Sequence, residues 1–362
     1  MNDEGGAARA AAQFHLPGIP QVTGLLPGGL IHRSWLIEAG GVRFVLQRLN
    51  RAVFRDLDAV MSNMAIVTRH LAARLAADAT GEAERRALTL VATKQERDWW
   101  VDDAGDAWRC TLYVEGSTSR LTAESEGDAY EAGRAFGEFA HLMRDLQTPL
   151  AVTIPGFHDT PARLGALRDA AEADRAGRTS SVRPELSVIA AHSALAQVLP
   201  SMLASGALPE RTAHNDAKIA NVLFDSRTGK ALGVVDLDTV MPGSPLHDMG
   251  DLIRSTVGST AEDDPEPARM RARPEMFQAL VRGYCVGAGP GFSAAERALI
   301  VTAGRVITLE QAVRFLTDHL AGDVYYPIGR PGHNLDRART QLALFLDLTA
   351  RSEELEEIVA GI

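Results

Sequence analysis

The chain has 362 residues, 46% hydrophobic and 23% charged, which is ordinary usage for a soluble globular protein and favours two lobes over one core. Its formal net charge of −10 argues against non-specific binding to nucleic acid or to an anionic membrane. The two cysteines, Cys110 and Cys285, form no C-x-x-C pair and exclude a disulfide framework or a cysteine-rich zinc site.

The N-terminal stretch MNDEGGAARAAAQF starts with acidic residues and has no long apolar run, so we do not expect a secretory signal. No segment approaches the roughly 18 consecutive apolar residues of a membrane span. The few cysteines suit a reducing cytoplasm, where we expect the protein to be. We expect it to bind neither nucleic acid nor membrane, and the sequence implies no obligatory protein partner.

The first part of the chain predicts a small α+β lobe. Residues 1–20 are expected to form a flexible N-terminus, and the lobe itself is expected over residues 21–116. Short β-rich runs on either side of the AGG at 39–41 predict a hairpin. Apolar residues spaced by three and four over residues 53–75 predict a helix, and short strands are expected over 88–116.

The remainder, residues 117–362, predicts a larger and mainly helical lobe. Helical periodicity is strongest over residues 129–146, where apolar positions recur every three or four residues. Two short apolar strands, NVLFD at 221–225 and ALGVVDLDTV at 231–240, interrupt the helices and are separated by the turn SRTG. A β-rich lobe followed by a helical lobe with one short hairpin is a specific layout.

The stretch HNDAKIANVLFD at 214–225 concentrates polar groups before an apolar strand. His214, Asp216 and Asn221 have the H-x-D-x-x-x-x-N spacing of a kinase catalytic loop, and Lys218 stands two residues after the aspartate. Phosphoryl transfer needs such a set: a carboxylate to orient the hydroxyl, an amide oxygen for Mg²⁺ and a cation for developing charge. The alternative is an Asx-capped loop before a strand.

A second motif, VVDLDTVMPG at 234–243, follows at hairpin distance. Its apolar strand leads to Asp236, and kinases supply a second metal ligand in this way because Mg²⁺ prefers hard oxygen donors. Asp238 either assists or holds the following turn. A strand ending in aspartate is by itself more often a turn former, but together with the first motif it favours a phosphotransfer site.

These residues resemble the aminoglycoside phosphotransferase and choline kinase superfamily, and within it the N-acetylhexosamine 1-kinases, which phosphorylate the anomeric hydroxyl of GlcNAc and GalNAc. The resemblance extends over nearly the whole chain. Besides the two motifs, it is carried by FVLQRLN, WRCTLYVEG, AYEAGRAFGEF, TIPGFHDTPARL, RFLTDHLAGDVYY and HNLDR.

The resemblance implies a two-lobed protein-kinase-like α+β fold with ATP and Mg²⁺ as cofactors, bound with the acceptor in the cleft between the lobes. It implies Asp216 as the catalytic base, Asn221 and Asp236 as magnesium ligands, and contact between Lys218 and the γ-phosphate.

The resemblance also implies binding residues for the sugar and for adenine. Arg314 and Tyr325, both from RFLTDHLAGDVYY, match positions that face the sugar. For Arg314 the alternative is an ion pair with Asp318, one helical turn further on. The backbone at Val114, Glu115 and Gly116 would hold adenine.

The expected phosphate-binding residues of the small lobe carry weaker signals. Gly28 and Gly29 lie between strand-like segments, where a kinase folds a loop over the phosphates and where a plain hairpin turn would look the same. Gln47, with Arg48 beside it, stands where many kinases have a lysine paired to a helix glutamate. The resembling family tends to carry glutamine there. His247 and Asp248 are expected to stabilise the start of a helix.

Several positions depart from the sugar 1-kinases and put the acceptor in question. Those kinases read closer to H-I-N-D-T in the glycine loop, and they usually carry threonine, asparagine and glutamate at three other places. Changing the hydrogen-bonding groups of a pocket alters which hydroxyl-bearing substrate is accepted. The departing residues are Leu30, Ile31, His32, Arg33 and Ser34 in the loop, and Ala217, Ala220 and Ser62 elsewhere.

The sequence therefore predicts ATP- and Mg²⁺-dependent phosphorylation of a hydroxyl on a small sugar or polyol, with the anomeric hydroxyl of an N-acetylhexosamine as the expected acceptor. A carbasugar (cyclitol) kinase and an aminoglycoside kinase share the same transfer residues. An alternative of another class is a nucleotide-binding pseudokinase that serves as an interaction module, which the missing small-lobe lysine favours.

Overall fold

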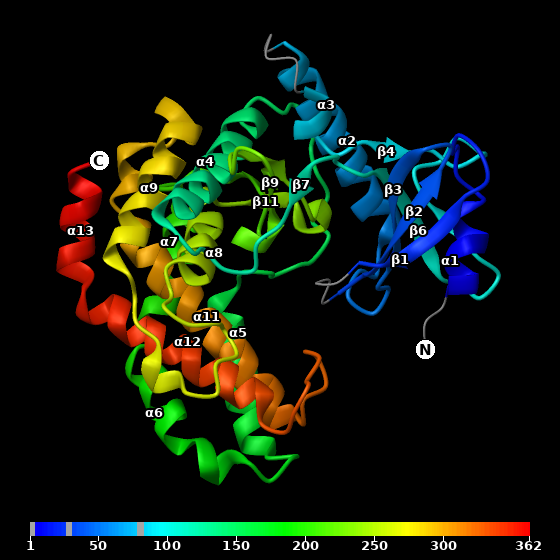
Figure 1. The fold of residues 1–362 in the computed structure, drawn as a ribbon. Coiled ribbons are helices and arrows are strands. Elements are labelled where there is room, and N and C mark those ends of the chain that lie inside the picture. Colours follow the sequence, from blue (N-terminus) through cyan, green and yellow to red (C-terminus); the bar gives the residue numbers. More distant parts are fainter. Residues whose placement is uncertain (1–3, 27–30, 78–82) are drawn as a thin grey trace. The chain divides into compact units, whose positions relative to one another are not determined.

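The protein is described by a computed structural model over residues 4–26, 31–77 and 83–362, and the chain divides into two compact units. The first is built around a β-sheet and the second is mainly helical (Figure 1). This is the protein-kinase-like α+β fold that the sequence predicts. Unit 1 comprises Met1–Ser117, Asp145–Ile154 and Leu237–Met241, and unit 2 comprises Thr118–Arg144, Pro155–Asp236 and Pro242–Ile362.

Unit 1 contains an antiparallel sheet in the order β1-β2-β3-β6-β4, with β5 paired to β6. The predicted hairpin joins β2 to β3, where Ala39 pairs with Val42. Gly40 and Gly41 take φ values of 57° and 79°, which is why two glycines stand in this two-residue turn. The strands are β1 Gln21–Leu25, β2 Arg33–Ala39, β3 Val42–Leu49, β4 Leu90–Val91, β5 Trp100–Val101 and β6 Ala107–Leu112.

The N-terminal segment differs from the flexible stretch expected over residues 1–20. Residues Glu4–Ala11 form helix α1, and Ala7, Ala10 and Ala11 are fully buried in the core of unit 1. Alanines at these spacings give one thin apolar face, which packs with the buried Phe14 against the sheet. Small side chains produce a weak apolar pattern, so the sequence did not reveal this helix.

The predicted long helix of unit 1 is α2, Leu57–Ala76. The side chain of Asp56 accepts a hydrogen bond from the backbone N–H of Ala59 and caps its start, as aspartate does at helix N-termini. The short helix α3, Ala83–Arg86, follows.

Unit 2 is built around the close pairing of α4 and α9. A Cβ added at Gly133 of α4 would lie 2.1 Å from the carbonyl oxygen of Leu280, and one added at Gly283 of α9 would lie 2.0 Å from that of Tyr130, so glycine allows the two backbones to touch. The helices of unit 2 are α4 Glu126–Met143, α5 Thr160–Ala173, α6 Arg183–Ala191, α7 Val198–Ala204, α8 Pro245–Thr256, α9 Pro274–Ala288, α10 Ala294–Arg297, α11 Ile300–Ala321, α12 His333–Ala350 and α13 Ser352–Ala360.

The predicted hairpin of the helical unit joins β9, Val222–Asp225, to β10, Ala231–Val234, in antiparallel pairing. Asp225 closes the turn by accepting hydrogen bonds from the backbone of Arg227 and Thr228. The other short strands are β7 Ser117–Thr118, β8 Arg211–Ala213 and β11 Met241–Gly243.

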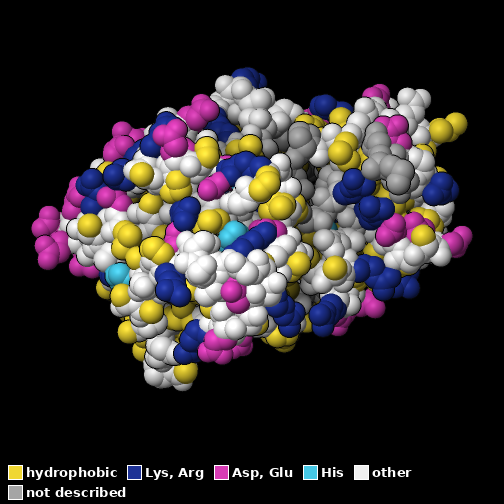
Figure 2. Space-filling model, turned by 90° about the horizontal axis from the view of Figure 1, so that it is seen from below, with side chains coloured by type: hydrophobic (Ala, Val, Ile, Leu, Met, Phe, Trp, Pro, Cys, Tyr) yellow, Lys and Arg dark blue, Asp and Glu magenta, His cyan; other side chains and the backbone are white. Residues whose placement is uncertain are grey.

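Within the described ranges, no single helix has the length and apolar character of a membrane span, although a pair bent by 54°, Thr179–Ala191 with Ser193–Ala204, passes by length and composition. On the face shown in Figure 2, acidic and basic side chains are interspersed and not separated into areas of one sign.

Candidate active site

The loop between β8 and β9 brings the two predicted catalytic residues, Asp216 and Lys218, into contact with the predicted metal ligand Asn221. Nζ of Lys218 lies 2.8 Å from Oδ2 of Asp216. The amide nitrogen of Asn221 donates to the carbonyl oxygen of Asp216 at 2.8 Å and to its Oδ2 at 3.1 Å. One aspartate therefore receives both a cation and an amide from residues two and five positions further along the same loop.

The two charges of this cluster stabilise one another. Burial raises the pKa of Asp216, but the Lys218 ammonium and the Asn221 amide outweigh burial and bring that pKa well below its usual value. Burial lowers the pKa of Lys218, but the charges of Asp216 and Asp236 outweigh it and raise that pKa above the usual value. At neutral pH the loop therefore carries an aspartate anion beside a lysine cation.

The backbone ahead of Asp216 is held from α8. Asn215 has φ +63°, an uncommon conformation for a residue other than glycine. Asp248 accepts hydrogen bonds from the backbone N–H of His214 at 2.9 Å and of Asn215 at 2.7 Å. Asp248 thus fixes the catalytic loop, whereas the start of α8 is capped by the Ser244 hydroxyl, which accepts from Leu246. Asp248 also lies in the first turn of α8, where an acidic side chain favours the helix start, as expected.

Asp236 and Asn221 lie close together because of the hairpin. The backbone N–H of Val235 donates to the carbonyl oxygen of Asn221 at 2.9 Å. Asp236 is the next residue in the chain and has φ +64°. Since the amide nitrogen of Asn221 is used by Asp216, its amide oxygen remains as a ligand atom. An amide oxygen next to a carboxylate is a donor set that suits Mg²⁺.

Arg314, on α11, is held between two aromatic rings. Its Cζ lies 5.4 Å from the ring centre of Phe157 and 5.8 Å from that of Tyr326. Nη1 of Arg314 donates a hydrogen bond to Oε1 of Gln311 at 3.1 Å. Among the described residues, the predicted alternative of an ion pair with Asp318 is not found.

Asp318 instead shapes the loop that carries Tyr325. Its carboxylate accepts hydrogen bonds from the backbone N–H groups of Val324, Tyr325 and Tyr326 at 2.8–2.9 Å. Tyr325 is 54% exposed, and its ring packs edge-on to Tyr326 with the centres 4.8 Å apart. The sequence singled out Tyr325 and missed Tyr326, whose ring also contacts Arg314.

In unit 1, Gln47 belongs to a buried polar network. Its amide oxygen accepts from Nε of Arg109 at 2.9 Å and its amide nitrogen donates to Ser34 at 3.1 Å. Arg109 forms a bidentate ion pair with Asp238, and the two side chains are 1% and 2% exposed. The carboxylate of Asp238 is thus engaged by Arg109 inside unit 1, and its assistance at the metal site stays a prediction.

The remaining small-lobe predictions lie at partly buried or exposed positions, or outside the described residues. Arg48 pairs with Asp106 at 3.1 Å. In the segment Val114–Gly116, the carbonyl oxygen of Val114 accepts from Ser117, and that of Glu115 accepts from Arg85. Gly28 and Gly29 lie outside the described residues.

Two buried ion pairs of unit 2 escaped the sequence reasoning. His158 Nδ1 lies 2.9 Å from Oε1 of Glu310, and Arg254 pairs with Asp251 at 2.7 Å. The charge of Asp251 also acts on Lys218. The partners in the first pair are 152 residues apart, and no local pattern links them.

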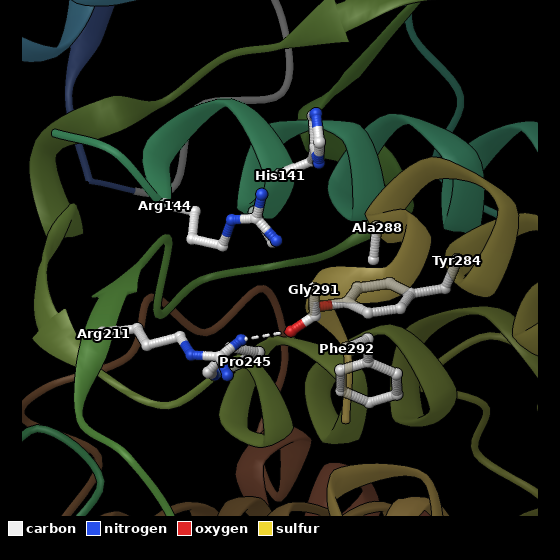
Figure 3. Close-up of a pocket in the computed structure, with 9 residues that line it drawn as sticks. His141, Arg144, Arg211, Pro245, Tyr284, Ala288, Gly291 and Phe292 are labelled. Atoms are coloured by element: carbon white, nitrogen blue, oxygen red, sulfur yellow. Dashed lines mark hydrogen bonds between the residues drawn. The ribbon is translucent and has the colours of Figure 1, made fainter. Parts of the chain in front are cut away.

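A separate small pocket of unit 2 lies between the end of α4, the end of α9 and β8 (Figure 3). Arg144, Arg211 and Tyr284 point into it, and the buried Tyr284 hydroxyl has no hydrogen-bond partner among the described residues. Its free volume of about 10 Å³ is near the minimum for one water molecule. No predicted site residue lines it, so we do not assign the substrate to it.

A family model described as "Phosphotransferase enzyme family" matches residues 23–295. Solved structures share the fold over nearly the whole chain. A microcompartment-associated aminopropanol kinase is 18% identical over 97% of this chain and 98% of that one, with a TM-score of 0.65. An aminoglycoside phosphotransferase from Alicyclobacillus acidocaldarius is 15% identical over 98% and 96%, with a TM-score of 0.63. A spectinomycin phosphotransferase, in complex with ADP and spectinomycin, is 11% identical over 94% and 95%, with a TM-score of 0.57.

Proposed function

The chain belongs to the phosphotransferase enzyme family, and from this premise we propose that it transfers the γ-phosphoryl group of ATP, with Mg²⁺, to a hydroxyl of a sugar. We propose the anomeric hydroxyl of an N-acetylhexosamine as the acceptor. The observation that carries the proposal is the contact of Asp216 with both Lys218 and Asn221 on one loop of unit 2.

Asp216 is suited to orient the acceptor hydroxyl and to take its proton. Its pKa lies well below the usual value because Lys218 and Asn221 together outweigh the effect of burial, so it is ionised at neutral pH and accepts hydrogen bonds. Lys218 is cationic and stands beside it, where it would neutralise charge that spreads over the transferred phosphoryl oxygens.

The residues that would hold the metal are Asn221 and Asp236. Their amide and carboxylate oxygens fit the preference of Mg²⁺ for hard donors, and the hairpin keeps the two residues adjacent. When bound, Mg²⁺ would offset the charge of the phosphates.

We propose that the backbone of Val114–Gly116 binds adenine. Among the described residues, the backbone N–H groups of Val114 and Glu115 donate no hydrogen bond, so they are available to ring nitrogens of a base. The carbonyl oxygen of Val114 is already used by Ser117. A structure of the same fold, the spectinomycin phosphotransferase, contains ADP.

The acceptor proposal rests on Arg314 and its surroundings. Arg314, Gln311 and Tyr326 form a connected polar and aromatic group that offers donors and ring faces to a polyhydroxyl compound. The exposed Tyr325 adjoins this group. Such a group suits a neutral sugar better than the polycationic acceptor of an aminoglycoside kinase.

A cyclitol kinase is the second candidate, and the departures from the sugar 1-kinase pattern in the glycine loop and at Ala217 and Ala220 favour it. Of the two alanines that depart from the sugar 1-kinases, Ala217 is fully buried whereas Ala220 is partly exposed. His32 is 7% exposed and binds Asp238 and the backbone of Asn50. Ala220 is therefore better placed than Ala217 or His32 to alter the acceptor.

The pseudokinase alternative rests on the missing small-lobe lysine. Gln47 stands in its place, and the neighbouring Arg109 is bound to Asp238. The intact contacts among Asp216, Lys218 and Asn221 argue against decay of the site, because a decayed site usually loses one of these residues.

A coupled ADP-release assay with Mg-ATP over a panel of hexosamines, cyclitols and aminoglycosides tests the proposal. We expect turnover with N-acetylhexosamines and an acid-labile phosphate at the anomeric carbon of the product. Turnover with cyclitols alone would support the second candidate. Nucleotide binding without turnover on any acceptor would refute the enzyme and support the interaction module.

A further inference from the structure

We infer that the dipeptide Phe157–His158 is a positioning element that ties α11, with its proposed acceptor residue Arg314, to the backbone of the catalytic loop. The inference rests on the proposed function insofar as it takes Asp216 as the base and Arg314 as an acceptor residue. The hydrogen bonds and ring contacts that support it lie within unit 2.

The first contact fixes the peptide that leads into Asp216. Nε2 of His158 donates to the carbonyl oxygen of Asn215 at 2.9 Å. That oxygen belongs to the peptide unit between Asn215 and Asp216. The hydrogen bond therefore restrains the orientation of this peptide plane, and with it the direction of the Asp216 side chain. Asn215 also has φ +63°, and such a conformation persists only where surrounding groups enforce it.

The second contact anchors the imidazole itself. Nδ1 of His158 lies 2.9 Å from Oε1 of Glu310, whose Oε2 accepts from the Thr160 hydroxyl at 2.6 Å. The side chains of His158 and Glu310 are 5% and 2% exposed. An imidazole donates from both nitrogens only when it is protonated, and Glu310 favours that form: burial lowers the pKa of His158, but the carboxylate outweighs it and the net shift is upward.

The third contact reaches the proposed acceptor residue. Phe157 presents its ring to the Arg314 guanidinium at 5.4 Å and packs edge-on to the His158 ring, with the centres 4.9 Å apart. Glu310 and Arg314 are one turn apart on α11. That helix therefore holds both members of the dipeptide, one by charge and one by a cation–π contact.

The consequence concerns catalysis more than stability. A misplacement of about 1 Å at a reacting group can cost on the order of 10²-fold in rate, and the Asn215 carbonyl is one bond from the backbone nitrogen of Asp216. Loss of the His158 donor should therefore lower kcat while nucleotide affinity, which depends on other residues, stays the same.

Paired substitutions isolate the donor from the volume of the side chain. His158→Gln keeps an N–H donor, whereas His158→Met has a similar size and none. We expect His158→Met to lose on the order of 10²-fold in kcat, His158→Gln to recover most of it, and nucleotide affinity to hold in both. The same pair at His192, which binds a helix carbonyl and packs on Phe345, is the control and should leave kcat unchanged.

Amide hydrogen exchange of the peptide 211–225 makes the inference independent of turnover. We expect faster exchange in His158→Met than in His158→Gln or the unsubstituted protein, with no such difference for the His192 pair. Equal exchange in the two His158 variants overturns the positioning role. If the unsubstituted protein phosphorylates nothing on the panel, the proposed function fails, and the exchange comparison still decides the role of His158.

The link to the acceptor has its own test. Phe157→Leu removes the ring face from Arg314 and keeps an apolar side chain, so we expect the acceptor KM to rise with little change in the KM for ATP. Phe292→Leu, at a buried phenylalanine that packs on Tyr284, is the control. An unchanged acceptor KM in Phe157→Leu would show that Phe157 does not position Arg314 for the acceptor.

Discussion

Nζ of Lys218 lies 2.8 Å from Oδ2 of Asp216, so the proposed base and the proposed phosphate-binding cation are in direct contact. The amide of Asn221 contacts the same oxygen at 3.1 Å. Both contacts use Oδ2, and we propose Oδ1 as the atom that orients the acceptor hydroxyl. The arrangement keeps the carboxylate ionised in a partly buried site, where desolvation favours its protonated form.

Replacing Asp216 by asparagine should abolish transfer and spare nucleotide binding. The amide has the same shape but cannot take the proton from the acceptor hydroxyl. General-base catalysis contributes roughly 10²–10⁴-fold to the rate. Coupled ADP release measures kcat, and calorimetry with a non-hydrolysable ATP analogue measures affinity. A variant with near-normal kcat would show that Asp216 is not the base.

Replacing Lys218 by methionine should lower kcat by about 10²–10³-fold, because a charge aimed at the transition state is lost. Lys218→Arg keeps the charge and should be less affected. Lys230→Met is a matched control, since Lys230 is exposed beside the β9–β10 turn. The assignment fails if both methionine variants behave alike in single-turnover measurements.

The sequence predicted the local contacts within the candidate site better than it predicted the residues that support them. Asp216, Lys218 and Asn221 share a loop, and a local spacing rule was enough to join them. The hairpin that brings Asp236 to Asn221 was also local, since a turn signal separates two short apolar runs. These parts of the fold and of the site are encoded over a few tens of residues.

The residues that hold the loop come from far away in the chain. Asp248 lies 33 residues after Asn215, and His158 lies 57 before it. Glu310 is a further 152 residues from His158. A buried charge on an amphipathic helix gives no sign of its partner in one sequence, so these contacts required the tertiary structure. Helix α1 was missed for a different reason, because alanine makes a faint apolar pattern.

Replacing Arg314 by glutamine should raise the acceptor KM without changing nucleotide affinity. The guanidinium contacts Phe157 and Tyr326 and donates to Gln311, and glutamine cannot fill this place between the two rings. Arg339→Gln serves as the control, because Arg339 pairs with Glu185 elsewhere in unit 2. Initial rates at varied acceptor and at varied ATP separate the two constants, and a rise confined to the ATP constant would refute the assignment.

Replacing Asp238 by asparagine should destabilise unit 1 strongly. Asp238 and Arg109 are 2% and 1% exposed, and removing one partner leaves a buried charge uncompensated, at a cost of about 3–5 kcal/mol. Asp106→Asn breaks the more exposed pair with Arg48 and should cost no more than about 1 kcal/mol. Urea denaturation of both variants gives the comparison, and equal losses would contradict the structural role of the Arg109–Asp238 pair.

Replacing His247 by phenylalanine should reduce the loss of unfolding free energy that occurs as the pH is lowered. Burial and the charge of His158, whose ring centre is 4.7 Å away, together lower the pKa of His247 to about 3, although the charge of Glu310 opposes them.

The sign of the His247 effect follows from its two pKa values. The unfolded chain takes up a proton near the ordinary value of 6.5 and the folded protein does so only near 3. The free energy of unfolding therefore falls as pH drops through this window, by up to about 1.4 kcal/mol per pH unit for one proton. Above pH 6.5 both states are neutral at this position and the effect vanishes.

Asp248 has the opposite effect on the pH dependence of stability, so its contribution must be separated from that of His247. Burial raises its pKa to about 6 from 3.8, so its contribution to stability grows as pH falls through that range and masks His247 in the unsubstituted protein. Urea denaturation at several pH values from 7 to 4, with His247→Phe compared against the unsubstituted protein, isolates the histidine. The variant should lose less stability on acidification, because phenylalanine binds no proton in the unfolded chain, and parallel curves would mean that His247 is protonated in the folded protein.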